Sequence, residues 1–185
     1  ATRLPAFIIK RIPFRFVYDN NYFNDPFQGI PKGGFGLLME RLLEGIEVKL
    51  NTDYLLKRNE WNKIADKILF TGCIDSFFDC SLGRLEYRSL RFEHEHLDID
   101  NYQGNAVVNY TEKQIPYTRI IEHKHFEFGE QPITVITREY PADYLPGNEP
   151  YYPVNDENNT KLFDRYRALA STQQKVLFGG RLAQY

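Results

Sequence analysis

Residues that cross-link small folds or bind metals are scarce in this chain. Among 185 residues there are 2 cysteines, 1 methionine and 4 histidines. Two cysteines cannot build a disulfide-dense scaffold, and the separation of Cys73 from Cys80 does not match a CxxC motif. The sequence also lacks an apolar run of membrane-spanning length and a signal-peptide pattern. These absences predict a reduced, cytoplasmic protein without a membrane partner.

An excess of charge of one sign is lacking as well. The formal net charge is −2 at pH 7, from 23 Lys and Arg against 25 Asp and Glu. A nucleic-acid-binding domain usually carries clustered positive charge, so nucleic acid is not an expected partner. The length suits one domain with a hydrophobic core, and we predict a single domain over residues 1–185.

Aromatic residues are abundant, with 13 Tyr and 14 Phe. Many of them lie in four segments that are rich in β-branched residues and separated by turn signals, which indicates strands. The connections are short, so the segments predict an antiparallel meander over 86–140. The four segments are Tyr87–His96, Asn105–Thr111, Tyr117–Phe126 and Ile133–Tyr140.

Helices are expected on either side of this sheet, and a further short strand is expected at Ile46–Leu50. The helix after Gly34 carries an apolar stripe that we expect in the core, whereas Pro141–Val154 should be a loop. The stripe comprises Phe35, Leu38, Met39, Leu42 and Leu43, and the other helical segments are Pro5–Ile12, Asn59–Asp66 and Asn159–Ala170.

Two short apolar runs, Ile68–Phe70 and Val176–Phe178, are each followed by glycine. Such runs are typical of strands buried on both faces of an open α/β sheet, where ligands bind at the carboxyl ends of the strands. The predicted fold class is therefore α+β. It is mainly an antiparallel sheet with flanking helices, with two strands of an incomplete α/β unit at 66–72 and 175–181.

Polar side chains interrupt partly apolar faces of three predicted strands. Period-two alternation puts Arg119 on one face with Tyr117, Ile121, His123 and His125. By the same alternation Arg88 shares a face with Leu90 and Phe92, and Asn109 shares a face with Val107. Three such interruptions on neighbouring strands predict the wall of a polar pocket. The alternative is a salt-bridge network with glutamates.

All four histidines fall in two His-x-His pairs, His94/His96 and His123/His125. Facing pairs could bind a transition metal. Charged neighbours instead indicate a solvated end of the sheet, and the strand predicted at 105–111 would separate the two pairs. We therefore expect no metal site.

Catalytic groups are not evident, because no Ser-His-Asp or Cys-His arrangement can be identified. Arginine makes bidentate contacts with phosphate, and tyrosine stacks on a base or sugar. The combination fits a nucleoside diphosphate ligand and implies that a cofactor supplies the chemistry. The set comprises Arg11, Arg88, Arg119 and Arg181 with Tyr22, Phe23, Tyr117, Tyr151 and Tyr152.

Seven sequence blocks, in order and nearly end to end, resemble bacterial UDP-galactopyranose mutases. The blocks are Lys-Arg-Ile-Pro-Phe-Arg-Phe at 10–16, Asp-Asn-Asn-Tyr-Phe-Asn at 19–24, Phe-Gln-Gly-Ile-Pro-Lys-Gly-Gly at 27–34, Tyr-Gln-Gly-Asn-Ala-Val-Val-Asn-Tyr at 102–110, Pro-Tyr-Thr-Arg-Ile-Ile-Glu-His-Lys at 116–124, Pro-Tyr-Tyr-Pro-Val at 150–154 and Phe-Gly-Gly-Arg-Leu at 178–182.

The resemblance implies an enzyme that interconverts UDP-galactopyranose and UDP-galactofuranose, with reduced FAD as the nucleophile. Arg11 and Arg119 look like the family's two essential arginines, which grip the diphosphate and stabilise the leaving UDP. The resemblance further implies that Tyr22 and Phe23 line the nucleotide and that Tyr152 reaches the phosphates. It also implies three further roles: Asn109 lies near the sugar, Arg88 lies at the edge of the site, and Gly180 and Arg181 lie against the flavin.

The sequence departs from the family in three places. The N-terminal GxGxxG flavin-binding unit and the tryptophan motif of the mobile loop are absent, and a tyrosine and an aspartate of the family would lie past Tyr185. The resemblance thus implies a fragment that neither holds FAD tightly nor turns over alone. A flavin-free nucleotide-sugar binding module remains the alternative, and homodimerisation of the full-length parent stays open.

Overall fold

The computed structural model describes residues 16–18, 24–145 and 147–185. The chain divides into two units, 1–46 and 47–185, and each is described by itself. The helix predicted at Pro5–Ile12 and most of the aromatic loop that follows it lie outside the described residues.

The first unit contains helix α2, Gly34–Leu42, at the predicted place. None of its residues is buried, and Phe35 and Leu42 are 62% and 61% exposed. The prediction that its apolar stripe lies in the core is therefore wrong. The amphipathic pattern fixes the helix and its apolar face, but it does not supply a neighbour for that face.

The second unit begins with extended chain and two short helices. The strand predicted at Ile46–Leu50 is wrong, since these residues are irregular and Val48 and Leu50 are exposed. A β-branched run forms a strand only when another strand pairs with it. The helices that follow are η1, Leu55–Lys57, and α3, Arg58–Ile64, of which α3 confirms the predicted helical segment.

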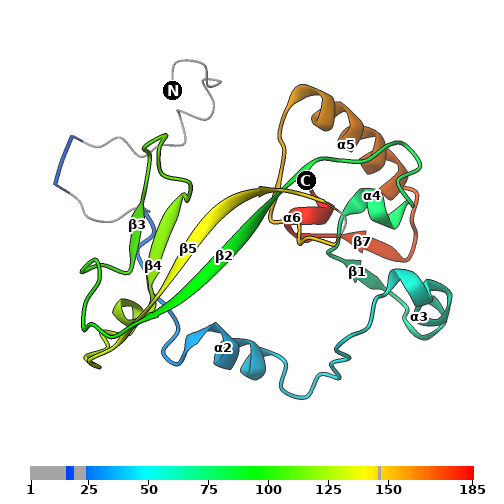
Figure 1. Cartoon of the computed structure of the whole chain (residues 1–185). Coiled ribbons are helices and arrows are strands. Elements are labelled where there is room, and N and C mark those ends of the chain that lie inside the picture. The colour runs from blue at the N-terminus through cyan, green and yellow to red at the C-terminus, as the bar shows by residue number, and fades with distance from the viewer. Residues whose placement is uncertain (1–15, 19–23, 146) are drawn as a thin grey trace. The chain divides into compact units, whose positions relative to one another are not determined.

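A five-stranded antiparallel sheet dominates this unit and has the order β3-β4-β5-β2-β6 (Figure 1). The long strands β2 and β5 pair over ten positions, from Arg88 opposite Asp143 to Leu97 opposite Thr134. The strand bounds are Tyr87–Leu97 for β2, Val107–Asn109 for β3, Arg119–Glu122 for β4, Thr134–Asp143 for β5 and Tyr152–Pro153 for β6. β6 and the end of β5 lie in the segment that was predicted to be a loop.

The predicted meander is correct for β3, β4 and β5 but wrong for β2, which lies beside β5 and not beside β3. The connection from β2 to β3 causes the difference. The carboxylate of Glu122, on β4, accepts hydrogen bonds from the backbone N–H groups of Tyr102 and Gln103 at 3.0 and 2.9 Å. The connection is thus held at the end of β4, beyond β5.

The strand predicted at Tyr117–Phe126 is correct only over β4. From His123 to Phe126 the chain forms a 3-10 helix, η2. The buried ammonium of Lys124 donates hydrogen bonds to the carbonyl of Asp100, at 2.5 Å, and to that of Gln131. These two contacts turn the chain away from the sheet, which a propensity argument cannot foresee.

A second, smaller sheet pairs β1, Ile68–Phe70, with β7, Val176–Phe178, in parallel. Both strands were predicted, but the expectation that both faces are buried is wrong. Leu69 and Leu177 face each other across the sheet and are 66% and 59% exposed. The other face packs into the core through Phe70 and Val176.

The core lies where the beginning of β2 meets helices α4, Ile74–Phe77, and α5, Glu157–Ala170. The short helix α6, Gly180–Ala183, lies beside them. Its centre is Tyr166, which is fully buried on α5. Helix α5 confirms the predicted helix and begins at Asp156, whose side chain accepts a hydrogen bond from the Asn159 N–H at 2.7 Å. The α+β prediction is confirmed.

Candidate functional site

One row of four side chains crosses the large sheet. Asn109 on β3 lies opposite Arg119 on β4, Arg119 lies opposite Glu139 on β5, and Glu139 lies opposite Phe92 on β2. Directly opposed residues project to the same face of a sheet. The structure therefore brings the predicted Asn109 and Arg119 together, and it adds Glu139 and Phe92, which sequence reasoning missed.

Arg119 is held at one end of its guanidinium group. Its Nε lies 3.3 Å from Oε1 of Glu139. This contact is an ion pair and not a directed hydrogen bond, since the buried Nε has no hydrogen-bond partner among the described residues. The side chain is 41% exposed, and no ion pair within the described part of the chain engages its terminal nitrogens. As far as the described residues show, that half of the guanidinium is available to an external anion.

Glu139 is the buried member of this pair, with a side chain that is 11% exposed. Its Oε1 also accepts a hydrogen bond from the hydroxyl of Thr118 at 2.9 Å. A buried carboxylate is costly unless it is paired and hydrogen-bonded, and Glu139 is both. The signal in the sequence was the alternation Val135, Thr137, Glu139, which puts a carboxylate on the face that the register matches to Arg119.

Three more predicted residues meet near the other end of the same face. Arg88 on β2 lies opposite Tyr152 on β6, and the guanidinium of Arg181 lies 5.1 Å from the centre of the Tyr152 ring. Arg88 also forms an exposed ion pair with Asp143 at 3.2 Å. Along β2, four residue steps from Arg88 to Phe92 separate this group from the first row by about 13 Å.

The alternative of a salt-bridge network is partly correct, because each of the two sheet arginines has an acidic partner on the neighbouring strand. The opposite face shows a complete network for comparison. There a terminal nitrogen of Arg138 lies 2.5 Å from Glu95, and Arg91 pairs with Glu93 and stacks 4.0 Å from the centre of the Tyr140 ring. The Glu95 contact raises the pKa of Arg138. Arg119, held only at Nε, differs from both.

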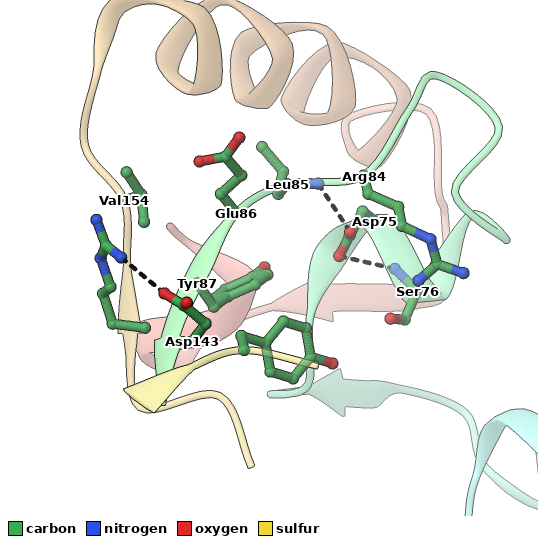
Figure 2. A pocket seen from close by; sticks show the side chains of 10 residues that line it. Asp75, Ser76, Arg84, Leu85, Glu86, Tyr87, Asp143 and Val154 are labelled. Atoms are coloured by element: carbon green, nitrogen blue, oxygen red, sulfur yellow. Dashed lines mark hydrogen bonds and ion pairs between the residues drawn. The ribbon is translucent and has the colours of Figure 1, made fainter. Parts of the chain in front are cut away.

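A pocket of about 310 Å³ lies at the base of β2 (Figure 2). Asp75 sits in its wall, buried, and its carboxylate accepts hydrogen bonds of 3.0 Å from the N–H groups of Ser76 and Leu85. Arg88 and Asp143, which form the exposed ion pair, also line this pocket. The pocket was not foreseen, because the loop that carries Leu85 has no periodic pattern.

Gly180 and Arg181 follow β7 after one residue, Gly179, and begin helix α6. Gly180 has a φ of +79°, which favours glycine, and a Cβ there would lie 3.5 Å from the side chain of Thr71, which follows β1. The carboxyl ends of the two parallel strands thus meet. Arg181 is exposed, and its Nη1 donates a long hydrogen bond of 3.4 Å to the Tyr151 carbonyl.

The two histidine pairs are not separated as predicted. His94 Nδ1 lies 2.8 Å and His123 Nε2 lies 2.6 Å from the same hydroxyl, that of Thr137 on β5. Burial and then the charge of His94 lower the pKa of His123. Within the described ranges no three His, Cys, Asp or Glu side chains form a group that could hold a metal.

Other predicted site residues, Arg11, Tyr22 and Phe23, lie outside the described residues. Where the structure does describe the chain, no helix has the length and apolarity needed to cross a bilayer.

Comparison with known proteins adds a family match. The family model described as UDP-galactopyranose mutase matches residues 1–185. The chain is 35% identical to a dTDP-fucopyranose mutase of Escherichia coli, over 98% of the chain and 50% of that protein. It is 38% identical to a probable UDP-galactopyranose mutase of Klebsiella pneumoniae, over 100% and 48%, and 31% identical to a UDP-galactopyranose mutase of Mycoplasma pneumoniae, over 96% and 48%. The chain thus spans about half the length of these curated relatives.

Proposed function

Because the chain belongs to the UDP-galactopyranose mutase family, we propose that it supplies the nucleotide-sugar diphosphate site of a mutase that interconverts UDP-galactopyranose and UDP-galactofuranose. The observation that carries this proposal is the guanidinium of Arg119, fixed at Nε by Glu139 and open at its terminal nitrogens. Two parallel N–H donors of this kind match a phosphate better than a lysine ammonium does.

In this proposal Arg119 and Arg11 bind the diphosphate, and Tyr152 contributes its hydroxyl. Negative charge grows on the diphosphate as the bond to the sugar breaks, and fixed guanidinium groups stabilise that charge without rearranging. Asn109, directly opposite Arg119, offers an amide to sugar hydroxyls. The row can thus orient the sugar and retain the nucleotide.

The proposal gives the remaining site residues further contacts with the ligand. Arg88 would contact the ligand from the edge of the site, where Asp143 now pairs with it. Tyr22 and Phe23 would stack along the nucleotide. Homologues carry both uridine and deoxythymidine names, and these aromatic contacts do not distinguish the two pyrimidines. The identity of the nucleotide base and the identity of the sugar are therefore proposed.

A flavin would lie at the carboxyl ends of β1 and β7 in this proposal. The residues at these strand ends fit such a group, because Gly180 carries no side chain and Arg181 is exposed beside Tyr152. Reduced FAD, when bound, supplies a nucleophile for the anomeric carbon. The contribution of this chain is then to hold the sugar's diphosphate on the neighbouring sheet face.

We also propose a cytoplasmic setting in which the product serves cell-wall polysaccharide synthesis. The two free cysteines suit a reducing compartment. The second candidate function is a flavin-free nucleotide-sugar binding module, which the same arginines would serve. We propose that the isolated chain is catalytically inactive, and flavin absorption together with turnover of UDP-galactofuranose by the purified chain would contradict this.

Titration of the purified chain with UDP tests the diphosphate site. Arg119→Ala should weaken UDP binding at least tenfold, because a charged donor pair is lost. Arg91→Ala is the matched control, since Arg91 lies exposed on the opposite face and should leave the affinity unchanged. Equal effects of the two substitutions, or no binding by the wild type, would refute the proposed site.

A further inference from the structure

The sheet carries arginine–glutamate pairs on both faces, but the pairs differ in which nitrogen is engaged. On one face Arg138 uses a terminal nitrogen, Nη1, toward Glu95. On the other face Arg119 uses Nε toward Glu139. Two terminal nitrogens of a guanidinium can bind one anion together. A guanidinium that is held at a terminal nitrogen has one of these two donors engaged, whereas one that is held at Nε keeps both for another partner.

Glu139 is fixed more firmly than a surface carboxylate. Its side chain is largely buried, and the Thr118 hydroxyl donates a hydrogen bond of 2.9 Å to its Oε1. The Thr118 N–H also donates to the backbone carbonyl of Glu139 at 2.8 Å. Both the backbone and the carboxylate of Glu139 are therefore hydrogen-bonded to Thr118, the residue that precedes Arg119.

We propose that Glu139 is a positioning residue, which with Thr118 orients the guanidinium of Arg119 toward the nucleotide diphosphate. This inference rests on the proposed function and goes beyond it. An unrestrained arginine loses rotamer freedom when it binds a ligand, and a preoriented one has already lost it. Glu139 itself stays behind the guanidinium and touches no phosphate, which its negative charge would repel.

The test measures orientation and affinity separately. In the ¹⁵N-labelled chain, relaxation of the Arg119 Nε–H signal, assigned by its loss in Arg119→Lys, reports how rigid the guanidinium is. Glu139→Met keeps the side-chain length but removes the carboxylate of the ion pair, and it should make the guanidinium mobile and weaken UDP binding roughly tenfold. Glu95→Met is the matched control on the other face and should change neither.

A second variant keeps the test decisive if Glu139→Met does not fold. Thr118→Val removes a hydroxyl from an exposed residue, and it should mobilise the Arg119 group and weaken UDP binding to a smaller extent. Unchanged UDP affinity with a mobilised guanidinium would overturn the positioning role, as would a wild-type Nε–H as mobile as that of an exposed arginine. If the wild-type chain does not bind UDP, the proposed function fails, while the relaxation measurement still tests the Glu139 contact.

Discussion

The hydroxyl of Thr134 donates a hydrogen bond of 2.8 Å to Oε1 of Glu122, and both side chains are almost completely buried. Burial opposes the charge of Glu122. The N–H groups of Tyr102 and Gln103, the Thr134 hydroxyl and His125 outweigh burial and lower the pKa of Glu122 from 4.5 to about 2. This carboxylate joins β4, β5 and the connection between β2 and β3.

The depressed pKa makes the contribution of Glu122 dependent on pH. Stability from the charged form is complete above the ordinary value of 4.5 and is lost as the pH falls toward about 2. At neutral pH, Glu122→Gln should lower the free energy of unfolding by about 3 kcal/mol. Urea denaturation should show that the difference in unfolding free energy between the wild type and Glu122→Gln narrows below pH 4.5. Glu130→Gln, at an exposed position, should show no comparable difference. A difference for Glu122→Gln that does not change with pH would contradict the depressed pKa of Glu122.

The pKa of His123 should depend on His94, because both side chains contact the Thr137 hydroxyl. The lowered pKa of His123 means that the folded state disfavours its charged form, so stability falls as the pH drops below the ordinary value of 6.5. His94→Gln should raise the pKa of His123 in an imidazole NMR titration. His96→Gln, two residues along the same strand, should leave that pKa where it is.

Arg119 should be required for turnover by a full-length mutase that contains this chain. Loss of a preorganised cation at a developing charge costs about 100- to 1,000-fold in kcat, so Arg119→Ala should reduce turnover of UDP-galactofuranose to that extent. Steady-state kinetics measure the effect, and Arg91→Ala provides the comparison from the opposite face. Near-normal turnover of Arg119→Ala would show that Arg119 has a purely structural role.

Tyr166 should stabilise the core through its hydroxyl as well as its ring. The hydroxyl donates to the Gly83 carbonyl at 2.6 Å and accepts from the Leu82 N–H at 3.1 Å. Tyr166→Phe leaves both backbone groups without this partner and should cost about 1–3 kcal/mol of unfolding free energy. Thermal unfolding tests this, with Tyr151→Phe as a control, because the Tyr151 hydroxyl donates a long hydrogen bond to the exposed side chain of Glu149.

The sequence alone predicts elements well where one local pattern decides them. Alternation found β2 and β5, and helical spacing found α2 and α5. It fails where a distant side chain decides, as when Lys124 ends β4 by binding the Asp100 and Gln131 carbonyls. Strand order failed for the same reason, since the Glu122 carboxylate fixes the connection after β2.

In the candidate site, too, a local pattern predicts some features and distant residues decide others. Alternation put Arg88, Asn109 and Arg119 on pocket-facing positions, and the strand register now puts all three on one face. The identity of the acidic partner could not be predicted, because Glu139 meets Arg119 only through a register that links positions 20 residues apart. Arg91, on the other face, looks equally available in the sequence and is occupied by Glu93 in the structure.

The ten consecutive pairs between β2 and β5 also limit how this part of the gene can change in length. Gain or loss of one codon between Arg88 and Phe92 would exchange the two faces for every residue beyond it. Phe92 would then leave the Arg119 row in either case. We therefore expect length variation among related sequences to gather in the connection 98–106, and the spacing of Arg88 and Phe92 to stay fixed.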